Sequence, residues 1–390
     1  MEQADPMSGG PEKPPGAPPS AATRALPSTM PRPMRVAILM CDAATADQGR
    51  GDENFLYEGA EHADRLMIEA AQSLGHTVLP HYVHLRNVDA VVDALDCDVV
   101  LNLCDGSGEG KDGLPGVEAI RALERRGLAY SGAGTRAYEL TSDKVRTKHV
   151  LRAAGVPVPH AQVFESADDP LDRELVGRRL IVKPSDSFGS SGIDLGSVVS
   201  SEEELRARVA SMLPVYGPPL VEEYIDGREI TVGLLGSGGR ARALPPLEVC
   251  FGEVFPGDRR IRTHATKWDV HSPLYGGFTL SCPARLPLAV TRRCLAVARA
   301  AYLACDCTGY GRVDLRVDAR GPFVLEVNAN CSLEWGETAG DCAMLPSAAQ
   351  AAGFSYAMLL QRLIDDALRM HAKRARAARA PRARRALTAR

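Results

Sequence analysis

Short apolar runs alternate with amphipathic segments in the first third of the chain. Val36–Met40, Thr77–Val83 and Asp98–Leu103 are apolar runs of strand length, whereas Gly59–Leu74 repeats its apolar positions at helical spacing. Strands that alternate with helices are typical of a parallel sheet with helices on both faces. We therefore predict a first α/β domain over residues 34–132.

The rest of the chain is richer in strands. Runs that indicate strands are Arg179–Lys183, Ile193–Val199, Leu220–Tyr224, Glu229–Leu235, Gly311–Val317 and Phe323–Val327. Helical spacing recurs over Ser142–Ala154, after Ser201, over Leu288–Leu303 and over Phe354–Met370. Ser142 is the expected N-cap of the first of these helices.

Both ends differ from the body in composition. Residues 1–33 contain nine of the 27 prolines, interleaved with Gly, Ala and Ser, which is typical of a disordered lead-in. Residues 372–390 form a basic tail with eight basic residues and no acid. This tail is the one candidate for polyanion contact, but a solvated end that frays or extends the last helix is the commoner explanation of such a segment.

Composition narrows the class of protein. The 390 residues allow two or three domains, and 45% hydrophobic with 24% charged residues is average for globular proteins. Residues 34–371 carry 46 acids against 35 bases, a poor match for a nucleic-acid surface. No apolar run approaches the roughly 20 residues that span a bilayer, and no secretory signal follows the start. We therefore expect a cytoplasmic protein without membrane contact.

A lysine and a loop of small residues form the first chemical feature. Lys183 ends an apolar strand and precedes Pro184-Ser-Asp-Ser-Phe-Gly-Ser-Ser-Gly192. Backbone N–H groups and serine hydroxyls in such a loop can hold phosphate oxygens beside the lysine charge. The order of residues differs from a P-loop, and an ordinary hairpin turn remains an alternative.

Two strands carry polar residues at alternating positions. Arg312 and Asp314 share one face of the first strand, and Glu326 and Asn328 share one face of the second. If the strands are neighbours, Asp314, Glu326 and Asn328 form an oxygen-only cluster suited to Mg²⁺ beside nucleotide phosphates. A solvated strand face is the alternative.

Eleven phrases in the chain, in the same order, resemble those of the ATP-grasp superfamily and, within it, the D-alanine–D-alanine ligases. They include Asn102-Leu-Cys-Asp-Gly, Ser142-Asp-Lys, Ile181-Val-Lys-Pro-Ser, Gly189-Ser-Ser-Gly, Val221-Glu-Glu-Tyr-Ile, Ala265-Thr-Lys-Trp, Gly309-Tyr-Gly-Arg-Val-Asp and Leu325-Glu-Val-Asn-Ala-Asn. The similarity is close over residues 98–370 and holds only in outline over 34–97. It implies an α/β protein whose ATP-grasp part is of the α+β type. In that fold a Rossmann-like domain (34–132) precedes a small central domain (133–221) and a larger mixed-sheet domain (222–371), with ATP between the last two.

The resemblance also implies a role for each matching residue in the ATP site. The phosphates would be held by Lys144 and Lys183 under the loop of Gly189, Ser190 and Ser191, with Lys267 at the γ-phosphate. Glu222 would lie at the adenine amino group, Tyr224 and Ile225 at the hinge, and Glu229 at the ribose. Asp314, Glu326 and Asn328 would hold two Mg²⁺ ions, or Mn²⁺ in their place.

The implied reaction is the ATP-dependent joining of a carboxylate to an amine through an acyl phosphate. Arg312, Lys267 and Ser191 would be catalytic, and Asn330, Ser332 and Glu58 are candidate contacts of the small amino-acid or carboxylic-acid substrates. A homodimer is also implied. Two alternatives stay open: an ATP-binding scaffold of the same fold without catalysis, and a polyanion-binding protein acting through the basic tail.

Three departures from the family pattern concern the substrate. The first strand lacks the family's Gly-Gly loop and following Glu, so Glu53, Glu58 and Glu61 are all candidates for the first substrate. Glu334 and Trp335 replace small residues where the acceptor is expected, and 251–278 is longer than in the family and rich in arginine. We therefore expect a different or larger acceptor, with drifted loops around an unchanged substrate as the alternative.

Overall fold

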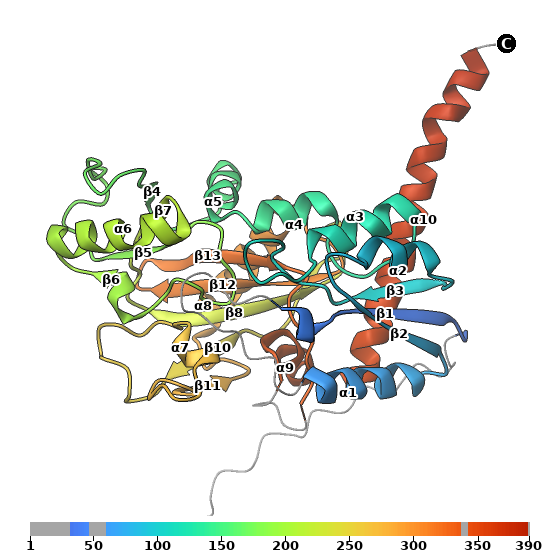
Figure 1. Ribbon diagram of the computed structural model, residues 1–390, viewed down its shortest axis with the longest axis horizontal. Helices are drawn as coiled ribbons and strands as arrows, with labels where there is room; N and C mark the ends of the chain where they lie inside the picture. Colours follow the sequence, from blue (N-terminus) through green and yellow to red (C-terminus); the bar gives the residue numbers. More distant parts are fainter. Residues whose placement is uncertain (1–31, 47–59, 337–341, 389–390) are drawn as a thin grey trace, which may run out of the picture.

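The computed structural model of the chain describes residues 32–46, 60–336 and 342–388 (Figure 1). Three sheets follow one another along the chain. In Figure 1 the first lies at the right, the largest runs through the centre, and the smallest lies at the upper left. Nearly all of the predicted lead-in, residues 1–31, lies outside the described residues.

The first sheet is parallel, with order β2-β1-β3. It consists of β1 (Arg35–Cys41), β2 (Thr77–Val83) and β3 (Val99–Asn102). Alternate residues of β1 face opposite sides: Val36 and Ile38 pack with α1 (Ala60–Gln72), and Ala37 and Leu39 pack with α2 (Val88–Ala94) and α3 (Val117–Arg126). The prediction of a parallel sheet covered on both faces is confirmed.

The second sheet is small and antiparallel, with order β4-β7-β5-β6. Its strands are β4 (Ala161–Val163), β5 (Leu180–Pro184), β6 (Val198–Val199) and β7 (Pro219–Glu223). Helix α6 (Glu202–Tyr216), capped by the Ser201 hydroxyl, packs its buried apolar residues on this sheet. The predicted strand Ile193–Val199 is wrong over most of its length. Asp194 caps the 3₁₀ turn Leu195–Ser197, and this turn bends the chain before β6.

Two helices lead into this sheet, α4 (Thr135–Thr141) and α5 (Lys144–Ala153). The predicted N-cap of α5 is wrong by one residue. The side chain of Asp143 accepts the Arg146 N–H at 2.9 Å, whereas Ser142 ends α4 and donates its hydroxyl to the Tyr138 carbonyl at 2.7 Å. Because Asp143 caps the helix, Lys144 occupies its first turn.

The largest sheet is antiparallel, with order β11-β10-β8-β12-β13, and β9 pairs with β8. Its strands are β8 (Arg228–Leu235), β9 (Arg242–Ala243), β10 (Leu247–Phe251), β11 (Phe278–Ser281), β12 (Tyr310–Asp318) and β13 (Gly321–Ala329). Helix α8 (Leu288–Ala304) buries Cys294, Ala298, Ala301 and Tyr302 against it. The short helices α7 (Ala265–Trp268) and α9 (Met344–Ala351) complete this part.

The last helix, α10 (Tyr356–Thr388), returns to the first sheet. Leu359, Leu363 and Ile364 are buried in one cluster with Val36 and Ile38 of β1. This helix therefore packs against the N-terminal part, although our predicted domain 222–371 contains its first half. Strand β7 also continues two residues beyond the boundary at 221. The division into domains stays a prediction.

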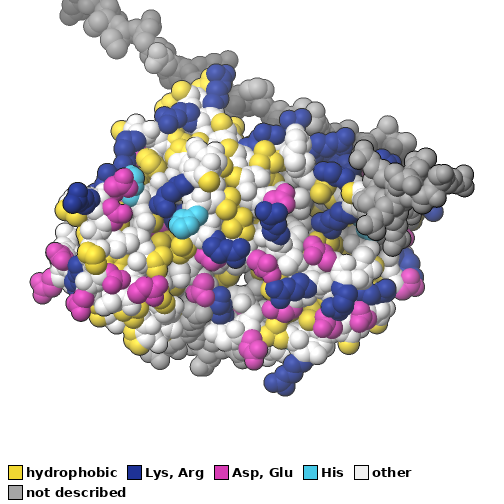
Figure 2. All heavy atoms as spheres, turned by 90° about the horizontal axis from the view of Figure 1, so that it is seen from above, with side chains coloured by type: hydrophobic (Ala, Val, Ile, Leu, Met, Phe, Trp, Pro, Cys, Tyr) yellow, Lys and Arg dark blue, Asp and Glu magenta, His cyan; other side chains and the backbone are white. Residues whose placement is uncertain are grey.

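The described surface seen from above has no single basic patch (Figure 2), as the excess of acids over bases in residues 34–371 leads one to expect. Figure 2 shows acidic and basic side chains intermingled over the face seen from above. A phosphate-binding surface instead gathers Lys and Arg in one patch. In the described residues, no helix combines the length and the apolar character that a membrane crossing requires.

Candidate active site

Two lysines pair with a buried carboxylate where the small antiparallel sheet meets α5, and a third, Lys144, lies in the same cavity. Glu222 of β7 is fully buried and lies 2.7 Å from the Nζ of Lys148 and 2.8 Å from the Nζ of Lys183. Burial opposes the ionisation of Glu222, but the two lysines outweigh it and hold the pKa of this carboxyl below its usual value. Burial also lowers the pKa of Lys144 and of Lys148 to about 8. The predicted contact of Glu222 with adenine stays a prediction, and the structure gives this residue a charge-balancing role.

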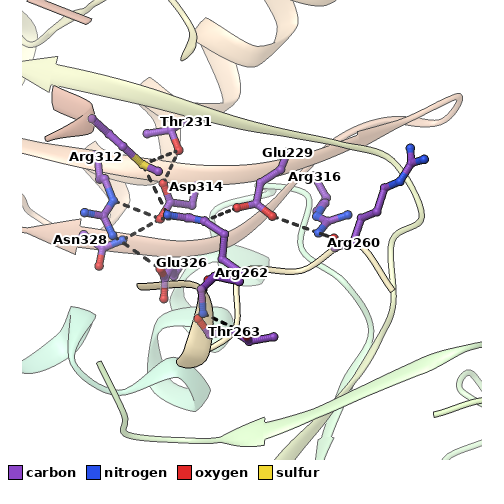
Figure 3. Close-up of polar contacts among 12 residues, drawn as sticks. Glu229, Thr231, Arg260, Arg262, Thr263, Arg312, Asp314, Arg316, Glu326 and Asn328 are labelled. Carbon is purple, nitrogen blue, oxygen red and sulfur yellow. Dashed lines mark hydrogen bonds and ion pairs between the residues drawn. The ribbon is translucent and has the colours of Figure 1, made fainter. Parts of the chain in front are cut away.

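A second carboxylate in the same cavity is paired with two arginines. Glu229 of β8 accepts from the Nε of Arg262 and lies 3.0 Å from Arg316 of β12 (Figure 3). The Arg316 guanidinium also lies 5.5 Å from the ring centre of Tyr224, within cation–π distance. Tyr224 and Ile225 line the same cavity, and their role as a nucleotide hinge stays a prediction. The ribose contact of Glu229 stays a prediction.

The predicted oxygen cluster is assembled by strand pairing. In the antiparallel pair β12–β13, Asp314 is opposite Glu326 and Arg312 is opposite Asn328. Asp314 accepts from Arg312 Nε at 3.1 Å, from Asn328 Nδ2 at 3.2 Å and from the Thr231 hydroxyl at 2.7 Å (Figure 3). Lys144 and Arg312 overcome the opposing effect of burial and hold the pKa of Glu326 well below its usual value.

The donor set fits a hard cation. Two carboxylates and one amide offer oxygen ligands of the kind that Mg²⁺ prefers. Among the described residues there is no group of three or more His, Cys, Asp or Glu side chains placed to hold a metal, which leaves this mixed set as the candidate.

The loop between Lys183 and Gly192 is held in place by other parts of the chain. The Nζ of Lys144 donates to the Ser187 carbonyl, Lys111 lies 3.0 Å from Asp186, and the indole N–H of Trp268 donates to Gly189 O at 2.8 Å. Ser190 has a positive φ of 68°, a conformation that a tight turn requires. The loop is therefore closed over the cavity by the N-terminal part, by α5 and by α7.

A second cavity of about 260 Å³ adjoins the first. The residues that line both cavities are Ser187, Phe188, Gly189, Lys267, Arg312 and Asn328. Burial, with Arg262 and Arg312 nearby, lowers the pKa of Lys267 to about 7. The shared wall thus carries two cationic groups and the tip of the loop, and Ser191 faces the second cavity.

The structure places two of the three candidate substrate residues in the second cavity and does not describe the third. Ser332 lines the second cavity. Asn330 lines it too, but its amide is used within the protein, because its Oδ1 lies 2.6 Å from the Tyr310 hydroxyl and its Nδ2 donates to Cys104 O at 2.9 Å. Glu58 and Glu53 lie outside the described residues.

Trp335 was predicted to lie at the acceptor because of its bulk, but the structure places it elsewhere. Its indole stacks on Tyr356 of α10, with ring centres 4.8 Å apart, and neither Trp335 nor Glu334 is among the residues that line the cavity. Likewise, the arginine-rich segment before α7 sends Arg262 into the first cavity rather than the second.

Sequence reasoning missed several residues that the fold brings to the two cavities. Lys148 follows Lys144 by four residues on α5, so helical spacing could have identified it. Arg316 continues the strand alternation after Arg312 and Asp314 and could have been found in the same way. Asp105 and Trp268 lie in two of the quoted phrases, Asn102-Leu-Cys-Asp-Gly and Ala265-Thr-Lys-Trp, but were given no role, and Lys111 gave no signal.

The comparisons with known proteins agree on one family. The D-ala D-ala ligase C-terminus family matches residues 150–365. A D-alanine–D-alanine ligase of Desulforudis audaxviator is 32% identical over 77% of this chain and 90% of its own length, and one of Bordetella pertussis is 34% identical over 63% and 72%. A Bacillus anthracis D-alanine–D-alanine ligase structure complexed with ATP has a TM-score of 0.63 at 23% identity and covers 87% of this chain and 99% of its own. The chain has the ATP-grasp fold and belongs to the D-alanine–D-alanine ligase family.

Proposed function

We propose that the protein is an ATP- and Mg²⁺-dependent ligase that joins a carboxylate to an amine, either D-alanine–D-alanine ligase or a close relative that joins another amino-acid pair. The observation that carries the proposal is the pair of adjoining cavities with Lys267 and Arg312 in their common wall. One cavity has the lysines and paired carboxylates of a nucleotide site, and the other has room for small substrates. A phosphoryl group can pass between them beside two cations.

The residues that line the two cavities suggest which group acts in each step of the reaction. Lys144 and Lys183 hold the ATP phosphates, and Lys267 and Arg312 stabilise the charge that develops as the γ-phosphoryl group moves to the substrate carboxylate. The amine then attacks the acyl phosphate, and phosphate leaves. The loop over residues 185–192, closed by Lys111 and Trp268, excludes water that would hydrolyse this intermediate.

Asp314, Glu326 and Asn328 are the residues that would hold Mg²⁺. When bound, the metal neutralises phosphate charge during transfer. Alignment of the two substrates in the second cavity supplies the remaining acceleration, which reaches about 7 to 11 kcal/mol in well-oriented reactions.

The test is phosphate release from Mg²⁺-ATP by the purified full chain, with product masses recorded. D-alanine is supplied first, followed by a panel of L- and D-amino acids and small carboxylic acids. D-alanine-dependent phosphate release with the mass of D-alanyl-D-alanine supports the first assignment, and turnover with another pair supports the relative. ATP binding without turnover across the panel contradicts the proposal in favour of a non-catalytic scaffold.

Removing residues 372–390 separates the proposal from the polyanion alternative. The ligase proposal expects unchanged turnover in this truncated protein. Turnover that depends on the tail, or on an added polyanion, contradicts it. The expected cytoplasmic location rests on the lack, in the sequence, of an apolar run long enough to span a bilayer, whereas the homodimer rests on the family resemblance. Light scattering of the purified protein tests the dimer.

A further inference from the structure

Three carboxylates line the second cavity, and two of them are used within the protein. Asp112 accepts the N–H groups of Ser107 and Leu114 at 2.9 and 3.0 Å, and Asp186 pairs with Lys111. Within the residues that the structure describes, the Asp105 carboxylate has no hydrogen bond or ion pair with another side chain. The cavity therefore contains one carboxylate that is available to a substrate.

The backbone around Asp105 is fixed on both sides. The Cys104 carbonyl accepts from Asn330 Nδ2, and the Gly106 carbonyl accepts from the Tyr138 hydroxyl at 2.8 Å. Gly106 itself packs so tightly that a Cβ there would lie 2.2 Å from the Leu114 carbonyl oxygen. These buried contacts fix the backbone on both sides of Asp105, so its side chain is held at the cavity wall before any substrate binds.

The surroundings of Asp105 suit proton transfer near neutral pH. Although its side chain is accessible from the cavity, the enclosing protein raises its pKa to about 7, with Glu334 and Asp112 adding to the effect and Arg312 opposing it. The other titratable groups that face it come from α4, β12, the segment after β13 and its own loop, and burial raises the pKa of each: Tyr138, Tyr310, Cys331 and Cys104.

The ligation step needs a proton acceptor, because an amine nucleophile is an ammonium ion at neutral pH. Arg312 cannot accept a proton, and Lys267 stays protonated once phosphate charge lies beside it. Lys111 and Asp186 neutralise each other, and Asp112 is used by the loop backbone. Asp105 is what remains among the described residues of the cavity.

We propose that Asp105 is the general base of amide formation, an assignment that rests on the proposed function. The carboxylate takes one proton from the ammonium group of the acceptor. The freed lone pair forms the C–N bond to the acyl carbon, and the bond between that carbon and the phosphate oxygen breaks. Inorganic phosphate leaves with the bonding electrons and takes the second proton that the nitrogen loses as the amide forms. The proton on Asp105 passes to solvent when the product departs.

The experiment compares two nucleophiles in the wild type and in Asp105→Asn. One nucleophile is the acceptor amino acid. The other is hydroxylamine, which is already unprotonated near neutral pH and traps the acyl phosphate as a hydroxamate. We expect Asp105→Asn to lower amide formation by about 10²- to 10⁴-fold, the range of general acid–base catalysis, while hydroxamate formation stays within about threefold.

Two further variants control the result. Asp105→Glu should restore part of the amide rate, and Glu109→Gln, an exposed acid of the same loop, should behave like the wild type. The wild-type amide rate should rise with pH through an ionisation near pH 7 as Asp105 loses its proton. Asp105→Asn should lack this ionisation.

Two results in the variant overturn the assignment. Amide and hydroxamate formation that fall together would make Asp105 a binding residue of the first substrate or a part of the fold. An unchanged amide rate would remove it from the chemistry. If the unmodified protein forms neither product with any donor, the proposed function itself fails and takes this assignment with it.

Discussion

The two cavities treat their carboxylates differently. In the first cavity, the proposed nucleotide cavity, Glu222 is held by two lysines and Glu229 by two arginines, so each of these acidic charges is balanced before a ligand binds. In the second cavity, the proposed substrate cavity, Asp105 has no such partner among the described residues. Balanced charges fix a binding site in place, whereas an unbalanced carboxyl group remains able to exchange a proton. The difference agrees with our proposals that the first cavity positions a nucleotide and that the second performs proton chemistry.

Arg312→Ala tests the wall between the cavities and should have the largest effect. Without the guanidinium, the charge that develops on the transferred phosphoryl group loses one of its two cationic partners. We expect a fall of about 10³-fold in phosphate release, at the upper end for loss of one stabilising group. Arg292→Ala, at an exposed position of α8, is the matched control. Near-normal turnover in a folded Arg312→Ala protein would contradict the site.

Lys148→Met tests whether the nucleotide cavity depends on balanced charge. The change leaves buried Glu222 with Lys183 as its one remaining ion-pair partner. We expect the free energy of unfolding to fall by about 3 kcal/mol, the lower end for a broken buried pair. Urea denaturation measures the loss, and the double variant Lys148→Met/Glu222→Gln should recover part of it.

The loss of unfolding free energy in Lys148→Met should depend on pH. Because the pKa of Glu222 is lowered in the folded protein, its pairing contributes stability above the unfolded value of 4.5, and this contribution is lost as pH falls. The difference between the wild type and Lys148→Met should therefore narrow in acid. A difference that stays constant from pH 7 to pH 3 would show that packing, rather than charge, sets the effect.

The residues of the first cavity could largely be predicted from the sequence, whereas fewer of those that line the second could. The register of Asp314 with Glu326 was accessible because a two-residue period fixes which side chains share a face, and the strands are neighbours along the chain. Lys144, Lys183 and the glycine-serine loop, which line the first cavity, were also predicted to lie together, because they occur in short continuous phrases; their contact with phosphates stays a prediction. The nucleotide half of the site is thus largely encoded locally.

The substrate half depends on contacts between distant segments. The pKa of Asp105 is raised first by burial and then by Glu334, which lies more than 200 residues further along the chain. Trp335 was expected at the acceptor because of its bulk, but the return of α10 offers it Tyr356 as a stacking partner. No local pattern reports where a helix at the end of the chain will pack.

Trp268→Phe tests the closure of the loop over the substrate cavity and should have a moderate effect. Phenylalanine keeps an aromatic ring but loses the N–H that donates to the Gly189 carbonyl. One hydrogen bond is worth about 1 kcal/mol, so the loop should open about fivefold more often and admit water. We expect the ratio of ADP to amide product to rise. Trp335→Phe, which changes an indole outside the cavity, should leave this ratio unchanged.

Proton uptake on nucleotide binding is the smallest effect and probes Lys144 and Lys267, which both line the first cavity. The lowered pKa values of Lys144 and Lys267, about 8 and about 7, leave both partly unprotonated at pH 8 in the empty protein. The negative charge of a triphosphate favours the protonated form and raises both values. Binding of a non-hydrolysable ATP analogue at pH 8 should therefore take up on the order of one proton, measured by calorimetry in buffers of different ionisation enthalpy. The uptake should disappear at pH 6, where both lysines already carry their protons, and should shrink at pH 8 in Lys267→Met. Proton release at pH 8 would mean that these lysines do not face the phosphates.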